Sequence, residues 1–242
     1  MTIALTSIPD GESLAASGPL ADALDARLRD ASPLEILGAA RSTFGNDLAI
    51  VSSFGTESAV LLHMAAQVDR TIPVIFLDTG HNFPETLAYR DTLTALLGLT
   101  DVRSVAPDER ALAARDPQTS LWADAPDACC ALRKTEPLQR ALAPFSAWVN
   151  GRKRFQSASR ATIRTVEADG ARVKFNPLAA LGAAEIIGWM RAHNLPQHPL
   201  KAQGFTSIGC MPCTSRVQPG EDPRAGRWRG SSKTECGIHT SW

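Results

Sequence analysis

The centre of this sequence alternates short apolar runs with segments of helical periodicity, which restricts the fold to a narrow class. Runs typical of buried strands occupy residues 48–53, 72–78, 102–105 and 146–150. Helical patterns lie between them at residues 58–68, 84–97 and 126–142, and Pro137 is expected to kink or divide the last. Strand–helix alternation at this spacing predicts an α/β fold with a doubly wound, mostly parallel sheet. Ligands of such sheets bind beyond the carboxyl ends of the strands.

The segments that flank this centre show weaker patterns. Leu20, Leu24 and Leu28 recur every four residues, which is typical of an amphipathic helix, and Ser32-Pro33 predicts the start of another helix. Further on we expect a hairpin and a helix, the hairpin being joined across Asp169-Gly170. The hairpin strands are expected at residues 162–166 and 173–175, and the helix at 185–194. These patterns divide the chain into a peripheral segment (1–30), a binding domain (31–215) and a mobile C-terminal tail (216–242).

Composition narrows the function classes. A chain of 242 residues, 44% hydrophobic and 21% charged, can bury a core without disulfides. Its 25 basic and 25 acidic residues balance, which argues against a purely electrostatic partner such as nucleic acid or a membrane surface. The N-terminus shows no basic region before an apolar run, and no apolar stretch reaches 18 residues, so we expect a cytoplasmic protein.

A loop rich in small polar residues follows the first central strand. Small residues and one glycine let a backbone approach an anion, and the N-terminus of the next helix supplies N–H groups and a partial positive charge. The loop is not a Walker A or GxGxxG motif, and an ordinary strand–helix turn with a serine cap is the alternative. The candidate anion-binding residues are Ser52, Ser53, Gly55, Thr56, Glu57 and Ser58.

The next strand also ends in polar residues, at Asp78, Thr79 and Gly80. Two polar, glycine-bearing strand ends side by side predict a nucleotide pocket at the carboxyl edge of the sheet. For Asp78 the alternative is a turn cap.

Four of the five cysteines fall in two close pairs, Cys129-Cys130 and Cys210-Met211-Pro212-Cys213. A CxxC turn directs two sulfurs at one metal, and a second pair brought in by the fold would complete four thiolates. Zinc and iron–sulfur clusters both accept four cysteines, so ligand type leaves the metal open. Adjacent ligands strain a compact zinc site more than a larger cubane, which favours [4Fe–4S]. Small buried hydrophobic cysteines are the alternative.

The fifth cysteine, Cys236, stands alone near the C-terminus. Basic residues are frequent in the same segment, and nearby cations favour the thiolate form of a cysteine. A thiolate on a mobile segment can attack a bound electrophile and then be presented to a second protein. An exposed cysteine without a role is the alternative.

Several segments together resemble one known family. They are SSFGTESAVLLHM, FLDTGHNFPET, CCALRKTEPL, SIGCMPCT, GEDPRAGRW and ECGIH. The resemblance as a whole runs from about residue 35 to residue 240. The set resembles the assimilatory sulfonucleotide reductases, most of all the cluster-bearing branch that reduces adenylyl sulfate (APS). The resemblance implies an adenine nucleotide alpha-hydrolase-like (PP-loop) fold and a modified PP-loop at residues 52–58.

The resemblance also implies roles for individual residues. Cys236 matches the nucleophile, Lys134 a lysine between cluster and substrate, and Arg160, Arg224 and Arg227 anion-binding arginines. The implied [4Fe–4S] ligands are Cys129, Cys130, Cys210 and Cys213. This chain departs from the family at residues 198–201, where HPLK stands for the usual NPLH.

The implied reaction is attack of the Cys236 thiolate on the sulfur of APS. AMP leaves, an S-sulfocysteine remains, and thioredoxin or glutaredoxin releases sulfite from it. Because thiols supply both electrons, the role expected for the cluster is electrostatic and structural. A homo-oligomer is also compatible with this expectation.

Three alternatives stay open at this point. The first is the same reaction on 3′-phosphoadenylyl sulfate (PAPS), in which the basic run of residues 152–154 would reach the ribose 3′ position unless it is a solvated loop. The second is an ATP pyrophosphatase of tRNA thiolation, although SSFGTES replaces the usual SGGxDS loop. The third is a cluster-bearing redox sensor without catalysis.

Overall fold

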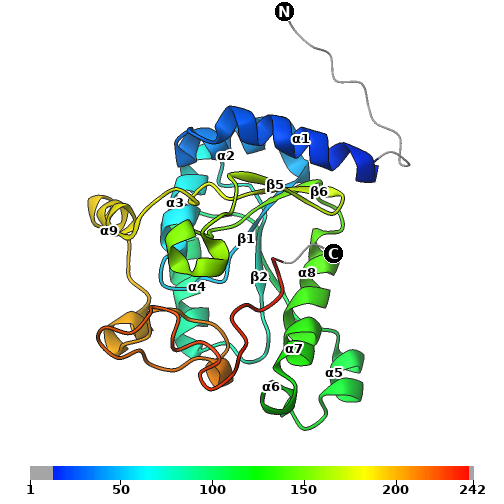
Figure 1. Ribbon diagram of the computed structural model, residues 1–242, viewed down its shortest axis with the longest axis vertical. Coiled ribbons are helices and arrows are strands. Elements are labelled where there is room, and N and C mark those ends of the chain that lie inside the picture. Colours follow the sequence, from blue (N-terminus) through cyan, green and yellow to red (C-terminus); the bar gives the residue numbers. More distant parts are fainter. Residues whose placement is uncertain (1–12, 240–242) are drawn as a thin grey trace, which may run out of the picture.

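The computed structural model describes residues 13–239 and is built around one six-stranded sheet (Figure 1). The strand order is β3-β2-β1-β4-β6-β5, and all neighbours are parallel except β5, which runs antiparallel to β6 at the edge. This confirms the predicted doubly wound, mostly parallel sheet. The strands are β1 (Leu48–Val51), β2 (Val74–Leu77), β3 (Val102–Val105), β4 (Ala147–Val149), β5 (Val166–Asp169) and β6 (Arg172–Phe175).

Helices cover both faces of the sheet because the strand side chains alternate between two apolar cores. In β1, Leu48 and Ile50 join the larger core, whereas Ala49 and Val51 join the smaller one. The larger core is covered by α1 (Ser13–Leu28), α2 (Pro33–Phe44), α3 (Ser58–Val68), α4 (Pro84–Leu97) and α9 (Ala183–Ala192). The smaller core lies under α8 (Glu136–Leu142), which Figure 1 shows on the opposite side of the sheet from α3 and α4.

Helices α1 and α2 precede the first strand, and different contacts hold them in place. Ser32 and Glu35 form a reciprocal capping box at the start of α2, with Pro33 in its first turn, as the sequence predicts. Helix α1 starts before the repeating leucines and packs on the hairpin edge, where Asp25 accepts the Val166 N–H. Leu24 is buried in the larger core, so this helix shares the core of the domain.

The expected long helix over residues 126–142 is divided. It consists of α7 (Pro126–Cys130), a π-helical turn (Ala131–Thr135) and α8, and Pro137 lies in the first turn of α8. Proline lacks an N–H and cannot continue the regular bonding pattern of a helix. The prediction that the helix breaks near Pro137 is thus confirmed. Two short helices, α5 (Glu109–Arg115) and α6 (Leu121–Asp124), precede it.

The first strand of the hairpin is predicted too early in the sequence. The structure places it at Val166–Asp169, with Val166 opposite Phe175 and the turn at Gly170. Ile163 is buried but belongs to a turn, because its N–H donates to the carbonyl of Arg160. An apolar side chain under a turn imitates the start of a strand, which explains the error.

The C-terminal segment has little regular structure but lies along the carboxyl edge of the sheet. Isolated antiparallel bridges join Thr214 to Arg227 and Cys210 to Asn82, and the Trp228 N–H donates to the carbonyl of Cys213. Ile238 packs against the smaller core, so the segment returns toward α8, as the red trace in Figure 1 shows. In the described part of the chain, no helix has the length and apolarity to cross a membrane.

Candidate active site

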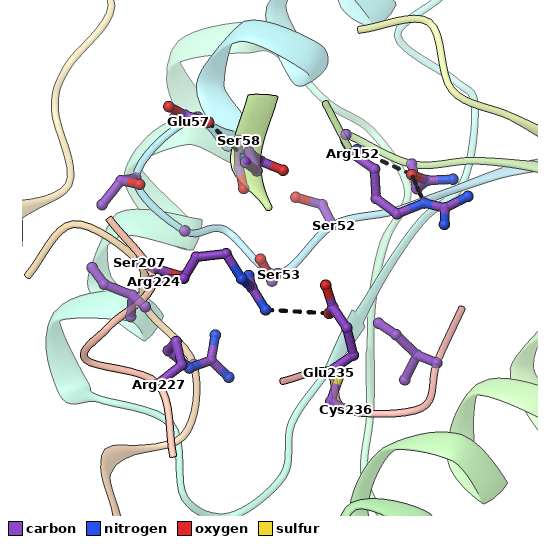
Figure 2. Close-up of a pocket in the computed structure, with 18 of the residues that line it drawn as sticks. Ser52, Ser53, Glu57, Ser58, Arg152, Ser207, Arg224, Arg227, Glu235 and Cys236 are labelled. Carbon is purple, nitrogen blue, oxygen red and sulfur yellow. Dashed lines mark hydrogen bonds and ion pairs between the residues drawn. The ribbon is translucent and has the colours of Figure 1, made fainter. Parts of the chain in front are cut away.

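A cavity of about 240 Å³ opens at the carboxyl ends of β1, β2 and β4. Its walls come from the β1–α3 loop, from the segment after β4 and from the C-terminal segment (Figure 2). Parallel sheets place ligands at this edge, and the structure shows the cavity where the strand pattern predicts it.

The β1–α3 loop lines one wall and contributes all six residues that the sequence singled out there. Phe54, in the left-handed region with φ +48°, turns its ring inward against Phe76, so the small residues around it face the cavity. The Thr56 hydroxyl donates to the carbonyl of Thr206 and fixes the loop to the C-terminal segment. The residue that caps α3 is Glu57, whose side chain makes no capping bond. The serine-capped turn is therefore not what the structure shows.

The end of β2 contributes less than expected. Thr79 lines the cavity and its hydroxyl lies 3.3 Å from Cys210 Sγ. Asp78 and Gly80, contrary to expectation, are not among the lining residues. The Asp78 carboxylate instead accepts the Gly80 N–H, which is the turn-capping role that the sequence left open.

The basic run after β4 is buried, so the idea of a solvated loop is wrong for Arg152 and Lys153. Lys153 Nζ pairs with the Glu57 carboxylate at 2.9 Å, and Arg152 pairs with Glu167 and donates to Asn176. Burial lowers the pKa of both basic groups, and the paired carboxylates oppose that shift. Both cations line the cavity with partners already in place.

Three arginines, called the arginine wall below, and one lysine form another part of the cavity surface. Arg160, Arg224 and Arg227 line the cavity, as does the half-buried Lys134. Arg227 Nε is buried and has no hydrogen-bond partner among residues 13–239, and its guanidinium lies over the Trp228 ring. Four cationic side chains from three segments thus meet at one end of the cavity.

Cys236 lies on the same cavity, beside Glu235 (Figure 2). Three residues of the ECGIH motif that the sequence analysis did not single out also line the cavity, namely Glu235, Ile238 and His239. The His239 ring stacks on Trp148 with an interplanar angle of 3°, and burial holds its pKa well below the usual range. Membership of the ECGIH motif, beside Cys236, could have identified these residues as part of the site.

The four remaining cysteines converge on a second, small cavity beside the first. Cys129 and Cys130 end α7, Cys210 precedes a single turn of 3₁₀ helix, and Cys213 is the last residue of that turn. Burial raises the pKa of both α7 thiols to about 11, so metal binding there has to expel protons. Within the described residues no three metal-binding side chains are close enough to hold an ion as they stand.

The surroundings of these thiols nevertheless suit an anionic metal–thiolate group. His81 Nε2 and Trp228 Nε1 are buried without hydrogen-bond partners in the described part, and both side chains line the small cavity. Lys134 lines both cavities. Burial lowers the pKa of Lys134, but the sulfurs of Cys210 and Cys236 raise it by more, so this pKa lies above its usual value. Potential N–H donors and a cation around four thiols are what a cluster with thiolate ligands requires.

The π turn after Cys130 fixes this region to the sheet. Arg133, on that turn, donates to the Asp116 carboxylate at 2.6 Å and to the carbonyl of Thr79 at 2.9 Å. Both charged groups are almost fully buried, so the pair is held in one geometry. The turn therefore ties the Cys129-Cys130 pair to the end of β2.

The fold and the position of the cavity define an α/β protein with a PP-loop-type fold. The solved structure of phosphoadenylyl-sulfate reductase from Candida auris, a phosphate complex, is similar with a TM-score of 0.69 and 28% identity, covering 88% of this chain and 99% of that one. Yeast FAD synthetase shares the fold alone, with a TM-score of 0.52 and 15% identity over 87% of this chain and 70% of that one.

Sequence comparison gives the family. The model of the phosphoadenosine phosphosulfate reductase domain matches residues 47–216. Adenosine 5′-phosphosulfate reductase of Mesorhizobium japonicum is 54% identical, covering 96% of this chain and 90% of the relative. Phosphoadenosine 5′-phosphosulfate reductase of Gloeobacter violaceus is 43% identical, covering 87% and 89%. The chain belongs to the phosphoadenosine phosphosulfate reductase family, as its resemblance to the sulfonucleotide reductases implies.

Proposed function

We propose that this protein reduces adenylyl sulfate to sulfite and AMP, with thioredoxin or glutaredoxin as the electron donor. The observation that carries the proposal is the position of Cys236, which shares one cavity with the PP-loop and with the arginine wall. The relatives named adenosine 5′-phosphosulfate reductase, at up to 54% identity, support the same activity.

In this proposal the nucleotide binds along the β1–α3 loop. Backbone N–H groups at the start of α3 and the hydroxyls of Ser52 and Ser53 suit the α-phosphate, because a helix N-terminus favours negative charge. The sulfate end then reaches Arg160, Arg224 and Arg227, where positive charge compensates its negative charge.

The chemical step is a displacement at sulfur. The Cys236 thiolate forms a bond to the sulfur of APS while the bond from that sulfur to the bridging oxygen breaks, and AMP leaves with the electron pair. Lys134 and the arginines stabilise the negative charge that develops on the phosphate. A thiolate of the donor then attacks Cys236 Sγ and sulfite leaves with the sulfur–sulfur electron pair. The second thiol of a dithiol donor closes its disulfide and frees Cys236, so two electrons reach the sulfur.

We further propose that Cys129, Cys130, Cys210 and Cys213 hold a [4Fe–4S] cluster. The converging thiols and the buried groups of His81 and Trp228 that lack partners in the described part support this assignment. When bound, the cluster supplies a large, polarizable anionic centre that the cation of Lys134 faces. A cytoplasmic location and a homo-oligomeric state belong to the proposal as expectations.

APS is proposed over PAPS because of the basic run after β4. Arg152 and Lys153 are already paired with Glu167 on β5 and with Glu57 at the start of α3, two carboxylates that regular elements hold in place. Separating either pair would leave a partly buried carboxylate without this partner, which is costly.

The test is sulfite release from APS and from PAPS, measured side by side on anaerobically purified protein with thioredoxin as reductant. We expect sulfite from APS at much lower substrate concentration than from PAPS. Preference for PAPS would overturn the substrate assignment and direct attention to Arg152. Formation of AMP from ATP without sulfite from either nucleotide would overturn the proposal in favour of a pyrophosphatase.

A further inference from the structure

The arginine wall of the cavity already holds an anion that belongs to the chain itself. Glu235 forms a two-pronged ion pair with Arg160, whose Nε and Nη2 donate to the two carboxylate oxygens at 2.8 and 2.9 Å. Arg224 Nη2 lies 3.2 Å from the same carboxylate, as the dashed line in Figure 2 shows. One carboxylate therefore bridges two of the three wall arginines.

These ion pairs are largely removed from water. Only 12% of the Arg160 side chain, 16% of Arg224 and 27% of Glu235 is exposed. Burial raises the pKa of Glu235, but the two arginines and Arg227 outweigh it and hold that pKa below its usual range. Two-pronged arginine–carboxylate pairs are among the stronger polar contacts in proteins, so the carboxylate has to be displaced before another anion takes its place.

A carboxylate and a sulfate group can each present a pair of oxygens to two N–H groups of a guanidinium. The donors that fix Glu235 are the ones that the sulfate end of the nucleotide needs under the proposed function. Two anions on the same pair of donors would repel each other in a site of low dielectric constant. Glu235 and the sulfate end therefore compete for one position.

We propose that Glu235 occupies the subsite for the terminal anionic group of the nucleotide and is exchanged for it when substrate binds. This inference rests on the proposed function and extends it to selectivity between substrate and product. A nucleotide with two linked anionic groups displaces the carboxylate, whereas AMP, with one, is held by the loop and leaves Glu235 in place. Because Glu235 precedes Cys236 directly, the same exchange frees the segment that bears the nucleophile.

The test compares ADP and AMP binding by calorimetry in wild-type protein and in the Glu235→Gln variant. ADP serves as the probe because its β-phosphate stands where the sulfate of APS would lie, and neither nucleotide turns over. Glutamine keeps the shape and one acceptor oxygen but removes the charge. We expect the Kd for ADP to fall about tenfold, as loss of one competing charge-assisted contact implies, with little change for AMP.

Glu221→Gln is the matched control. It makes the same change in the same C-terminal segment, at a carboxylate that pairs with Arg229 away from the cavity. We expect it to leave both Kd values unchanged. Glu235→Asp keeps the charge on a shorter side chain, so its preference for ADP over AMP should lie between the wild-type and Glu235→Gln values.

Three results would overturn the inference: an unchanged Kd for ADP in Glu235→Gln, weaker ADP binding in a folded variant, or equal tightening of ADP and AMP. The kinetic counterpart is a fall in KM for APS without a rise in kcat, because a competing group is removed while the nucleophile stays the same. Sulfite release by the wild type tests the proposed function separately, so failure of one does not imply failure of the other.

Discussion

Cys236 and Glu235 are adjacent in the sequence, and both lie on the cavity, but only the cysteine has a chemical type that signals its role in advance. A cysteine among basic residues suggests a nucleophile. A glutamate in the same segment suggests nothing until its partners are known, and Arg160 lies far from it along the chain. At the residue scale, the role of a reactive side chain can therefore be predicted from its type, whereas the roles of the side chains around it cannot.

The first prediction concerns the nucleophile. Cys236→Ser should abolish sulfite release from APS, because a hydroxyl at neutral pH is a far weaker nucleophile than a thiolate and cannot form the S-sulfo intermediate. Nucleotide binding should remain, since the β1–α3 loop is unchanged. The visible absorbance of the proposed cluster should also remain, since the other four cysteines are unchanged. Sulfite release, ADP affinity and iron content measured on one preparation check this. Continued turnover by the variant would show that the nucleophile lies elsewhere.

His198 gives a pH-dependent prediction. Burial lowers its pKa to about 4. Its Nδ1 accepts the Leu200 N–H, and its Nε2 contacts the Thr86 hydroxyl at 3.0 Å. The folded state thus holds the neutral ring, and its stabilising contribution is fully present above pH 6.5. As the pH falls from 6.5 toward 4, the unfolded chain takes up the proton first, so stability should decline by up to about 2 kcal/mol by pH 5.

Chemical denaturation at pH 7.5 and pH 5 measures this decline. His198→Gln should be less stable than the wild type at pH 7.5 but should lose less stability on acidification. The exposed His193 supplies the control, and His193→Gln should keep the wild-type difference between the two pH values. An equal loss in wild type and His198→Gln would show that other groups control the acid sensitivity.

At the scale of elements, close approach of two loops shapes the arginine wall. Gly209 lies where a Cβ would come within 2.5 Å of Arg227 Cζ. The residue therefore leaves room for the guanidinium, and only glycine fits there without moving it. The local sequence gives no sign of this, because Arg227 comes from a different turn of the C-terminal segment.

Gly209→Ala should therefore displace Arg227 and weaken ADP binding about tenfold, equivalent to loss of one charge-assisted contact, while the protein stays folded. Gly188→Ala is the control, because no neighbouring atom lies within 4 Å of its added Cβ in α9. Calorimetric Kd values and thermal unfolding of both variants check this. Unchanged ADP affinity in Gly209→Ala would show that Arg227 does not bind the nucleotide.

At the scale of the whole molecule, the cysteine site joins distant parts of the chain. Cys129 and Cys130 end α7, whereas Cys210 and Cys213 belong to the segment that also fixes Trp228. A metal bound by both pairs connects the helical side of the sheet with the arginine wall. Metal binding to the folded state alone adds to its stability.

Removal of iron by anaerobic chelation should therefore lower Tm by at least about 3 °C, equivalent to about 1 kcal/mol for a chain of this size. The C-terminal segment should also become more sensitive to trypsin, which cleaves after its several arginines. Cys213→Ser should have similar effects and lose iron. Equal Tm values with and without iron would contradict a connecting role for the metal.

The sequence by itself determined the layered α/β architecture, the mostly parallel sheet and the place of a cavity at the carboxyl ends of its strands. These features can be recognised from local periodicity and residue type: the unbroken apolar run of β1, the capping box at Ser32, the spacing of the cysteine pairs and the small residues before α3. The predicted start of the first hairpin strand was wrong. The apolar side chain of Ile163 is visible in the local sequence, whereas the pairing of Val166 with Phe175 depends on a residue farther along the chain.

Only the tertiary structure decided which charges are free and which are paired. It buries Arg152 and Lys153 with carboxylates, turns Asp78 into a cap outside the cavity, and sets Glu235 on the arginine wall. The physical reason is that an ion pair depends on distance in space and on exclusion of water, and neither is recorded in the order of residues. Local sequence patterns determine which segments form helices and strands, and the packing of those segments determines which charged side chains form ion pairs.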